Sequence, residues 1–265
     1  MAVLSGILGA VTGVTELRKW DANVSTEFAE YVSSATDGAT GAIEGNQDWS
    51  GSYDVYGGTP ANMPGDSITF TGSIDGTNGV TGAAIVDSVT INWDIEGGGI
   101  INHVTAFSGD SIPTVGASVA TDAAVANPIS AIGTKFQIGD IPADVDDVRS
   151  MTLVITAANP SYVSSSTSGG TKRLAGNLSA SISISVYTDD WSTLPQNGDI
   201  EKVRLFTTGA LFWAIDWIAF KDLSSLVVDR EAAAIIGATI NGIWTGYLAG
   251  VKGQIADPTP TVFWP

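Results

Sequence analysis

Cysteine is absent from this chain of 265 residues. Disulfide frameworks, Cys-ligated zinc and thiol nucleophiles are therefore excluded together. Basic residues are also scarce, because only 11 Lys and Arg face 28 Asp and Glu, which gives a formal net charge of −17. This balance argues against a surface that binds the nucleic acid backbone. It fits either simple solubility or the wall of a channel through which a polyanion slides without sticking.

Residues that could act in catalysis or bind a metal or phosphate are scarce. His103 is the only histidine, and it lies in a strand-like apolar segment, so we expect it to have a structural role. The acidic run at residues 144–147 lacks the spacing of a calcium-binding loop and indicates a solvated turn. Gly-rich phosphate loops are absent as well. We therefore expect no enzyme activity, no cofactor and no metal.

Long hydrophobic runs are missing too. The most apolar segment, residues 209–220, is short and contains Asp216. No stretch reaches the eighteen or so apolar residues that a membrane span needs. The first fourteen residues are apolar but contain no Lys or Arg, so we expect no signal peptide, synthesis in the cytoplasm and no membrane partner.

One sixteen-residue phrase is present twice. "YVSSATDGATGAIEGN" begins at Tyr31, and "YVSSSTSGGTKRLAGN" begins at Tyr162, 131 positions later. The same offset aligns Arg18 with Arg149 and Tyr56 with Tyr187. A period this long exceeds that of solenoid repeats and indicates a duplicated domain. We predict one domain at residues 1–138, with a trailing linker, and a diverged copy at residues 139–265.

Both halves have the alternation of apolar and polar residues that is typical of half-buried antiparallel strands. It is clearest at residues 67–74, 87–95 and 179–187. The predicted fold is therefore mostly all-β: two tandem β-sandwich or barrel domains, with room for one short helix in each. Residues 229–243 contain helix formers as well as strand-like spacing, and we favour a strand there.

Several residues are candidates for self-association. The aromatic segment at residues 209–220 is either a central strand that is buried on both faces or a subunit interface. The C-terminal aromatic pair raises the same question. The first phrase contains the acidic residues Asp37 and Glu44, whereas the second contains the basic residues Lys172 and Arg173. We therefore predict that basic residues of one copy pair with acidic residues of the other. The interface candidates are Phe212, Trp213, Trp217, Phe220, Phe263, Trp264, Lys172 and Arg173.

The first half resembles the major tail tube proteins of long-tailed bacteriophages. The likeness lies in "VTELRKWDANV", the "GNQDWSGSY" turn and the later "GAAIVDSVTINWDIEGGG" segment. It covers about 100 residues, whereas the second half has "GNLSASIS" at the turn and is linked to the family only through the repeat. The matching residues are Trp20, Gly45, Asp48, Trp49, Gly51 and Ser52.

The resemblance implies a virion structural protein whose partners are itself and other virion proteins. Its domains would form a ring around a lumen through which DNA passes. A duplicated chain could close a six-domain ring as a trimer, with a hexamer as the other possibility. Two alternatives stay open: a capsid-decorating or head–tail connecting protein of the virion, and a carbohydrate-binding module that uses the aromatic residues of segment 48–58.

Overall fold

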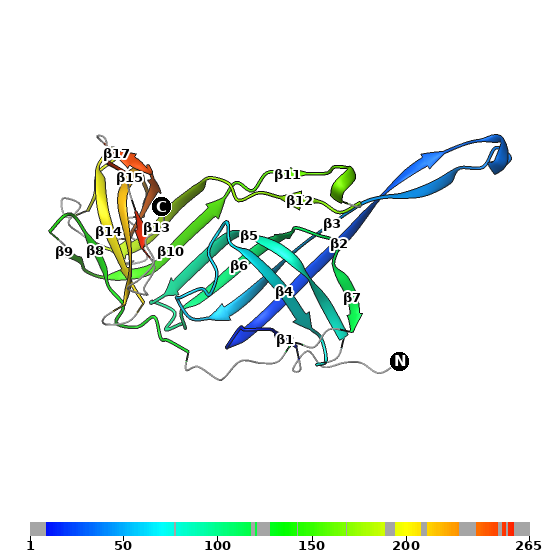
Figure 1. Ribbon diagram of the computed structural model, residues 1–265. Coiled ribbons are helices and arrows are strands. Elements are labelled where there is room, and N and C mark those ends of the chain that lie inside the picture. The colour runs from blue at the N-terminus through cyan, green and yellow to red at the C-terminus, as the bar shows by residue number, and fades with distance from the viewer. Residues whose placement is uncertain are drawn as a thin grey trace.

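The computed structural model describes residues 9–76, 78–117, 120, 128–141, 143–167, 169–188, 194–207, 211–227, 237–248, 251–252 and 254–256. The chain is nearly all β, so the predicted all-β class is confirmed, while the division into two tandem domains stays a prediction (Figure 1). The helical turns in the described residues are two short 3-10 helices, η2 (Ser34–Thr36) and η3 (Ser165–Thr167). Both lie in the repeated phrase. Residues 237–243 of the ambiguous segment 229–243 belong to a strand, and residues 229–236 lie outside the described residues.

Most strands belong to one large antiparallel sheet. The first half of the chain contributes β2 (Leu17–Tyr31), β3 (Gly41–Tyr56), β6 (Asn102–Gly109), β5 (Asn78–Asp94) and β4 (Ser67–Ser73), with β1 (Ala10–Val11) and β7 (Thr114–Ala117) beside them. The second half contributes β10 (Val148–Ala157), β13 (Leu178–Tyr187), β16 (Gly237–Trp244), β15 (Phe212–Val227) and β14 (Ile200–Phe206), with β8 (Phe136–Ile138), β9 (Ala143–Val145) and β19 (Ile255–Ala256). Two small ribbons complete the set: β11 (Ser161–Tyr162) with β12 (Lys172–Arg173), and β17 (Tyr247–Leu248) with β18 (Val251–Lys252).

The two halves have the same strand order. The series β2-β3-β6-β5-β4 corresponds to β10-β13-β16-β15-β14, and β8 pairs with β14 as β1 pairs with β4. Leu17 pairs with Val55, and Val148 pairs with Val186, each followed by a register shift at the next residue. A second shift follows Val86 in β5 and Phe220 in β15. Matching positions are thus 131 residues apart early in each half and 134 or 135 apart later.

The strand β10 joins the halves, because it pairs with the second part of β5. The register runs from Ser150 opposite Asp94 to Thr156 opposite Ser88. The first part of β5 pairs with β4 on the same side, and β6 covers the other side. One sheet therefore runs without interruption from β2 in the first half to β15 in the second.

A shared hydrophobic core also holds the halves together. The larger of two core clusters contains buried residues from both halves, and the smaller lies in the first half. Trp93 donates from Nε1 to the Phe206 carbonyl at 3.1 Å, and Trp213 donates from Nε1 to the Gly58 carbonyl at 3.0 Å. Each half thus places a tryptophan against the backbone of the other, and the polar end of each indole has a partner.

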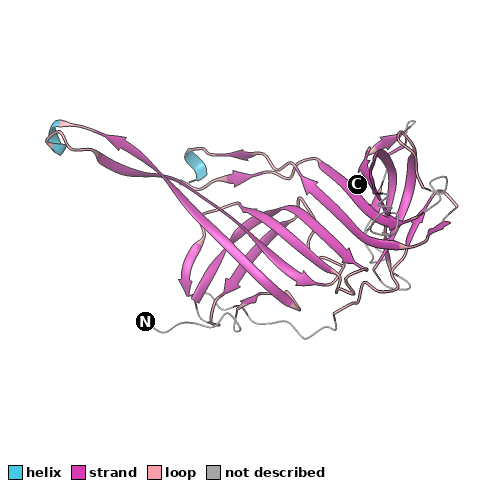
Figure 2. Cartoon of the chain, turned by 180° about the vertical axis from the view of Figure 1, so that it is seen from behind, coloured by secondary structure: helices cyan, strands magenta, loops and turns pink. Residues whose placement is uncertain are grey.

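Two hairpins extend from the sheet. The hairpin of β2 and β3 projects well beyond the body of the molecule (Figures 1 and 2). The ribbon of β11 and β12 runs toward the base of that hairpin (Figure 1). The sheet edges and these two hairpins are the features from which a self-associating surface could be built.

Candidate assembly surfaces

The repeated phrase forms the tips of the two hairpins. In the first tip the backbone N–H of Ser33 donates to Thr36 Oγ1 at 3.0 Å, and in the second that of Ser164 donates to Thr167 Oγ1 at 3.2 Å. The glycine that follows each 3-10 turn has a positive φ, 82° at Gly38 and 81° at Gly169, where residues with a Cβ are disfavoured. The phrase therefore recurs because it specifies one turn shape twice.

The second hairpin is docked on the first half of the chain. Its Arg173 donates to both carboxylate oxygens of Asp48, at 3.0 and 2.9 Å, and to the carbonyl of Gly109. Lys172 lies 3.5 Å from Asp110. Backbone bonds add to the contact, because the N–H of Gln47 donates to the Gly169 carbonyl at 2.7 Å. This docked hairpin is a latch between the halves.

The latch changes the electrostatics of Asp48. Burial alone would raise the pKa of its carboxyl, but the hydrogen bond and charge of Arg173, with the Trp49 N–H, hold the pKa below its ordinary value. The side chain of Arg173 is only 11% exposed, so this pair is shielded better than an ordinary surface ion pair. Lys172 and Arg173, which were predicted as interface residues, thus meet acids of the other half within one chain, and a role between chains stays a prediction. The acids are Asp48 and Asp110, however, and not Asp37 and Glu44 of the matching phrase.

Among the described residues, the first hairpin has no such latch. At the places of Lys172 and Arg173 it has Gly41 and Ala42, which have no charge to offer. Its apolar side chains face solvent, with exposed fractions of 64% at Phe28, 63% at Val32 and 60% at Ile43. Large exposed apolar groups that gather in one projecting element are typical of a contact with another protein.

Two strand edges lie open at the two ends of the sheet. In the described part of the chain β2 pairs with β3 alone, so its other edge has no strand beside it. Toward the other end, β14 covers one side of β15 only as far as Ala219, whereas β19 and β16 pair along the opposite side. Beyond Phe220 no described strand pairs with that first side of β15. Unpaired backbone groups in such edges are ready to pair with another chain.

The sheet face that points away from the core is lined with small polar groups. On the central strands most of the residues that alternate with the core are half-buried or exposed hydroxyl and amide side chains, and Thr156 Oγ1 lies 2.7 Å from Ser179 Oγ. None of these outward positions on β5, β10, β13 and β16 is Lys or Arg: Thr90, Asn92, Asp94, Ser150, Thr152, Val154, Thr156, Ser179, Ser181, Ser183, Ser185, Thr239, Asn241 and Ile243. Lys221 of the neighbouring β15 borders this face beside Thr152, Val154 and Ser181, so the face offers few cations to a nucleic acid backbone.

The aromatic residues predicted for an interface divide into three groups. Trp213 and Phe220 are 0% and 2% exposed in the shared core, so that part of the prediction is wrong and the central-strand alternative holds for them. Phe212 and Trp217 are half-buried: Arg204 lies 5.1 Å from the ring centroid of Phe212, and Lys202 Nζ lies 5.0 Å from that of Trp217. Phe263 and Trp264 lie outside the described residues.

The residues that carry the family resemblance are mostly structural here. Trp49 is 2% exposed, and its Nε1 donates to the Ser111 carbonyl at 2.7 Å. Trp20 donates to the Ser73 carbonyl at 3.2 Å, and Ser52 donates to Asp21 at 2.7 Å. Gly45 and Gly51 leave no room for a Cβ, which would come within 3.0 Å of the Glu27 carbonyl oxygen in the first case and 2.6 Å of Phe107 in the second.

Two of the three aromatic residues in segment 48–58 are not available as a sugar platform. Trp49 and Tyr53 are 2% and 3% exposed, because both rings pack with Phe107 in the smaller core cluster. A sugar ring stacks on an exposed aromatic face, which these residues cannot present in the folded chain.

His103 is a buried structural residue. It is 4% exposed, and its Nδ1 lies 2.7 Å from the Gly57 carbonyl oxygen. Burial lowers the pKa of the imidazole, although the Gly57 carbonyl and the charge of Asp54 act in the opposite direction. Among the described residues, no group of three or more His, Asp or Glu side chains could hold a metal ion. Asp144 of the acidic run pairs instead with Lys135 at 2.8 Å.

The chain matches no family model and no curated protein. Within the described residues, no helix has the length and apolar character to cross a membrane. The open edges and the exposed Phe28 were not predicted from the sequence. The alternation of apolar and polar residues predicts strands but does not indicate which strand lies at the edge of a sheet. Phe28 lies in such an alternating segment, so its exposure has no signal in the sequence. The second phrase did give one usable signal, the pair of adjacent bases at Lys172 and Arg173.

Proposed function

We propose that this protein is a virion structural protein, a tail tube subunit that associates with itself into rings around a DNA-conducting lumen. The family likeness of the first half suggests this class of protein. The observation that carries the proposal is the pairing of β10 with β5, because it joins the two halves of one chain by two edges whose equivalents, on β2 and on the last part of β15, have no partner strand among the described residues.

The equivalence of the halves gives the geometry of association. We infer that they are copies of one duplicated unit, since strand order, register and bulges agree. The short strands β1 and β8 would then open the two units. Inside the chain β10 pairs with β5. In the same way, β2 of a second copy can pair with β15. Repeating this head-to-tail step adds one chain at a time, and a heterologous interface of this kind gives a ring when the rotation closes.

The polar sheet face supports the lumen. Hydroxyl and amide groups with few cations among them would let a polyanion pass without tight binding, and the net charge of −17 acts in the same direction. DNA would thus be a passing partner and not a ligand. With six units around the ring, the chain would assemble as a trimer.

Electron microscopy of the purified full-length protein tests the proposal. Rings or tubes with a central channel are expected. Monomers or discrete trimers without a channel would contradict it and favour the other virion roles, a capsid-decorating or head–tail connecting protein.

A further inference from the structure

A small cluster of polar side chains lies at the junction between the two halves of the chain. Asn159, just beyond the end of β10, donates from Nδ2 to the Val86 carbonyl and to Asp87 Oδ1, both at 2.9 Å. Ser108 of β6 donates to the other carboxylate oxygen of Asp87 at 2.5 Å. The three side chains mark the point where β10 leaves the edge of β5.

The equivalent positions at the ends of the sheet have entirely different chemistry. Asn159 follows Thr156 by three residues as Phe28 follows Ser25, and Asp87 and Lys221 occupy the same bulge. Ser108 pairs with Ile85 as Ile243 pairs with Ala219. The polar triad of Asn, Asp and Ser thus becomes Phe28, Lys221 and Ile243. Phe28 lies on the first half of the chain, whereas the other two lie at the open edge of the second.

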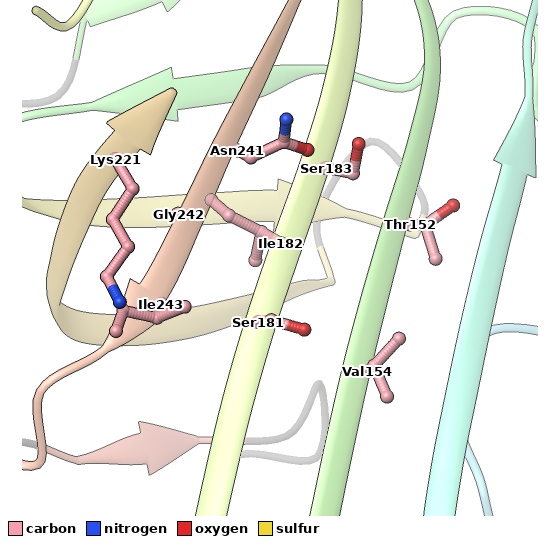
Figure 3. A pocket seen from close by; sticks show the side chains of 9 residues that line it. All are labelled: Thr152, Val154, Ser181, Ile182, Ser183, Lys221, Asn241, Gly242 and Ile243. Atoms are coloured by element: carbon pink, nitrogen blue, oxygen red, sulfur yellow. The ribbon is translucent and has the colours of Figure 1, made fainter. Parts of the chain in front are cut away.

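All three of these residues are exposed in the single chain. Phe28 is 64% exposed, Ile243 is 36% exposed and the side chain of Lys221 is exposed. Lys221 and Ile243 line one side of a hollow of about 210 Å³ on the sheet face, with Thr152, Val154 and Ser181 nearby (Figure 3). A buried cavity of about 150 Å³ is known to accommodate benzene, so the hollow has room for a phenyl ring. In Figure 3 the side chain of Lys221 ends with its ammonium nitrogen on the side of Ile243, so the apolar part of this wall is the methylene stem together with the isoleucine.

We propose that Phe28 of one chain inserts into this hollow of the next chain, between the stem of Lys221 and Ile243. The insertion rests on the proposed self-association and specifies its contact. It would occur when β2 pairs with β15 in the register that β10 uses with β5, which places Ser25 opposite Asp222 and Asn23 opposite Ser224. The occupant is a second copy of this chain, because the same step already exists inside the chain in polar form.

The difference in chemistry has a physical reason. Asn159 and Asp87 are held together by one polypeptide, so a hydrogen-bonded cluster suffices to fix their register. Separate chains also lose translational and rotational entropy when they associate. Burial of an aromatic side chain offsets this loss with a larger favourable free energy than a solvated polar contact supplies.

Exchange of the two triads tests the proposal. Phe28→Asn alone should raise the protein concentration needed for assembly about 10- to 100-fold, measured by light scattering and electron microscopy. The triple variant Phe28→Asn, Lys221→Asp, Ile243→Ser rebuilds the internal cluster between chains and should restore part of the assembly, because the cluster fixes the register but supplies less binding energy than the aromatic ring. A triple variant that assembles no better than Phe28→Asn would overturn the proposal. Ile141→Asn, at a residue that is 89% exposed between β8 and β9, controls for general loss of apolar surface and should assemble normally.

Cross-linking separates this contact from self-association in general. The chain has no cysteine, so Phe28→Cys and Lys221→Cys each introduce a single thiol. A short thiol-reactive cross-linker should give a covalent dimer in a mixture of the two variants and none in either variant alone. Assembly of the mixture without that dimer would overturn the Phe28 contact and leave the tube subunit intact. Failure of the unmodified protein to assemble would instead contradict the proposed function.

Discussion

The two halves of the chain build the same sheet with different side chains at matching places. Where β3 faces β6 in the first half, Gly51 lies under the ring of Phe107, whose nearest atom would be 2.6 Å from an added Cβ. The matching positions in the second half are Ile182 and Gly242, and there the isoleucine lies over the glycine, 3.3 Å from its added Cβ. Large and small residues have exchanged strands. The comparison teaches that the backbone arrangement is retained while the core volume moves from one strand to the other.

The substitution Gly51→Ile tests this difference in packing and should have the largest effect on stability. A side chain at position 51 would collide with Phe107 and with the Asp21 carbonyl, so we expect a loss of about 3 kcal/mol in the free energy of unfolding. The double variant with Phe107→Gly copies the combination of the second half and should recover part of that loss. Denaturant unfolding measures both. A double variant less stable than Gly51→Ile would show that the halves do not share this packing solution. Ser50→Ala, at an exposed neighbour, is the control.

Arg173→Met tests the contrast between the latched and the projecting hairpin. It removes the hydrogen bonds to Asp48 and Gly109 while retaining an apolar stem, and we expect a loss of about 2 kcal/mol. The hairpin at residues 158–177 should then become as sensitive to limited proteolysis as the one at residues 26–46. Lys19→Met, at an exposed base of β2, should change neither property. Continued protection of residues 158–177 would show that the backbone contacts to Gln47 suffice.

His103 provides the smallest and most selective test, since its matching position in the second half is Ala238. Burial lowers its pKa in the folded state, so the folded chain binds the proton less readily than the unfolded chain does. The stability that follows from the neutral imidazole is present above the unfolded pKa of about 6.5 and is lost as the pH falls through that value toward the folded pKa. Thermal unfolding between pH 7.5 and 5 should therefore shift less in His103→Gln than in the unmodified chain. Equal shifts would assign the pH dependence to the carboxylates.

The sequence predicted the strands well because alternation is a local property, as "SASISISVY" in β13 illustrates. It also predicted that Lys172 and Arg173 meet acids of the other half, although it named the wrong acids. Asp48 and Asp110 come close to Arg173 only through the fold, more than 60 positions away along the chain. Trp213 shows the same limit: an aromatic-rich strand has the same sequence pattern whether its second face meets a core or a partner. The edges of the sheet depend on which strands pair, and periodicity contains no such information.

The shared core has a mechanical consequence. Trp93 and Trp213 tie each half to the backbone of the other, and β5 and β10 are hydrogen-bonded over seven paired positions. The angle between the two halves is therefore set when a single chain folds, before it meets another copy. In any larger structure built from this chain, the angles between the two halves of each chain are fixed in advance. Only the angles between neighbouring chains can respond to concentration, salt or a binding partner.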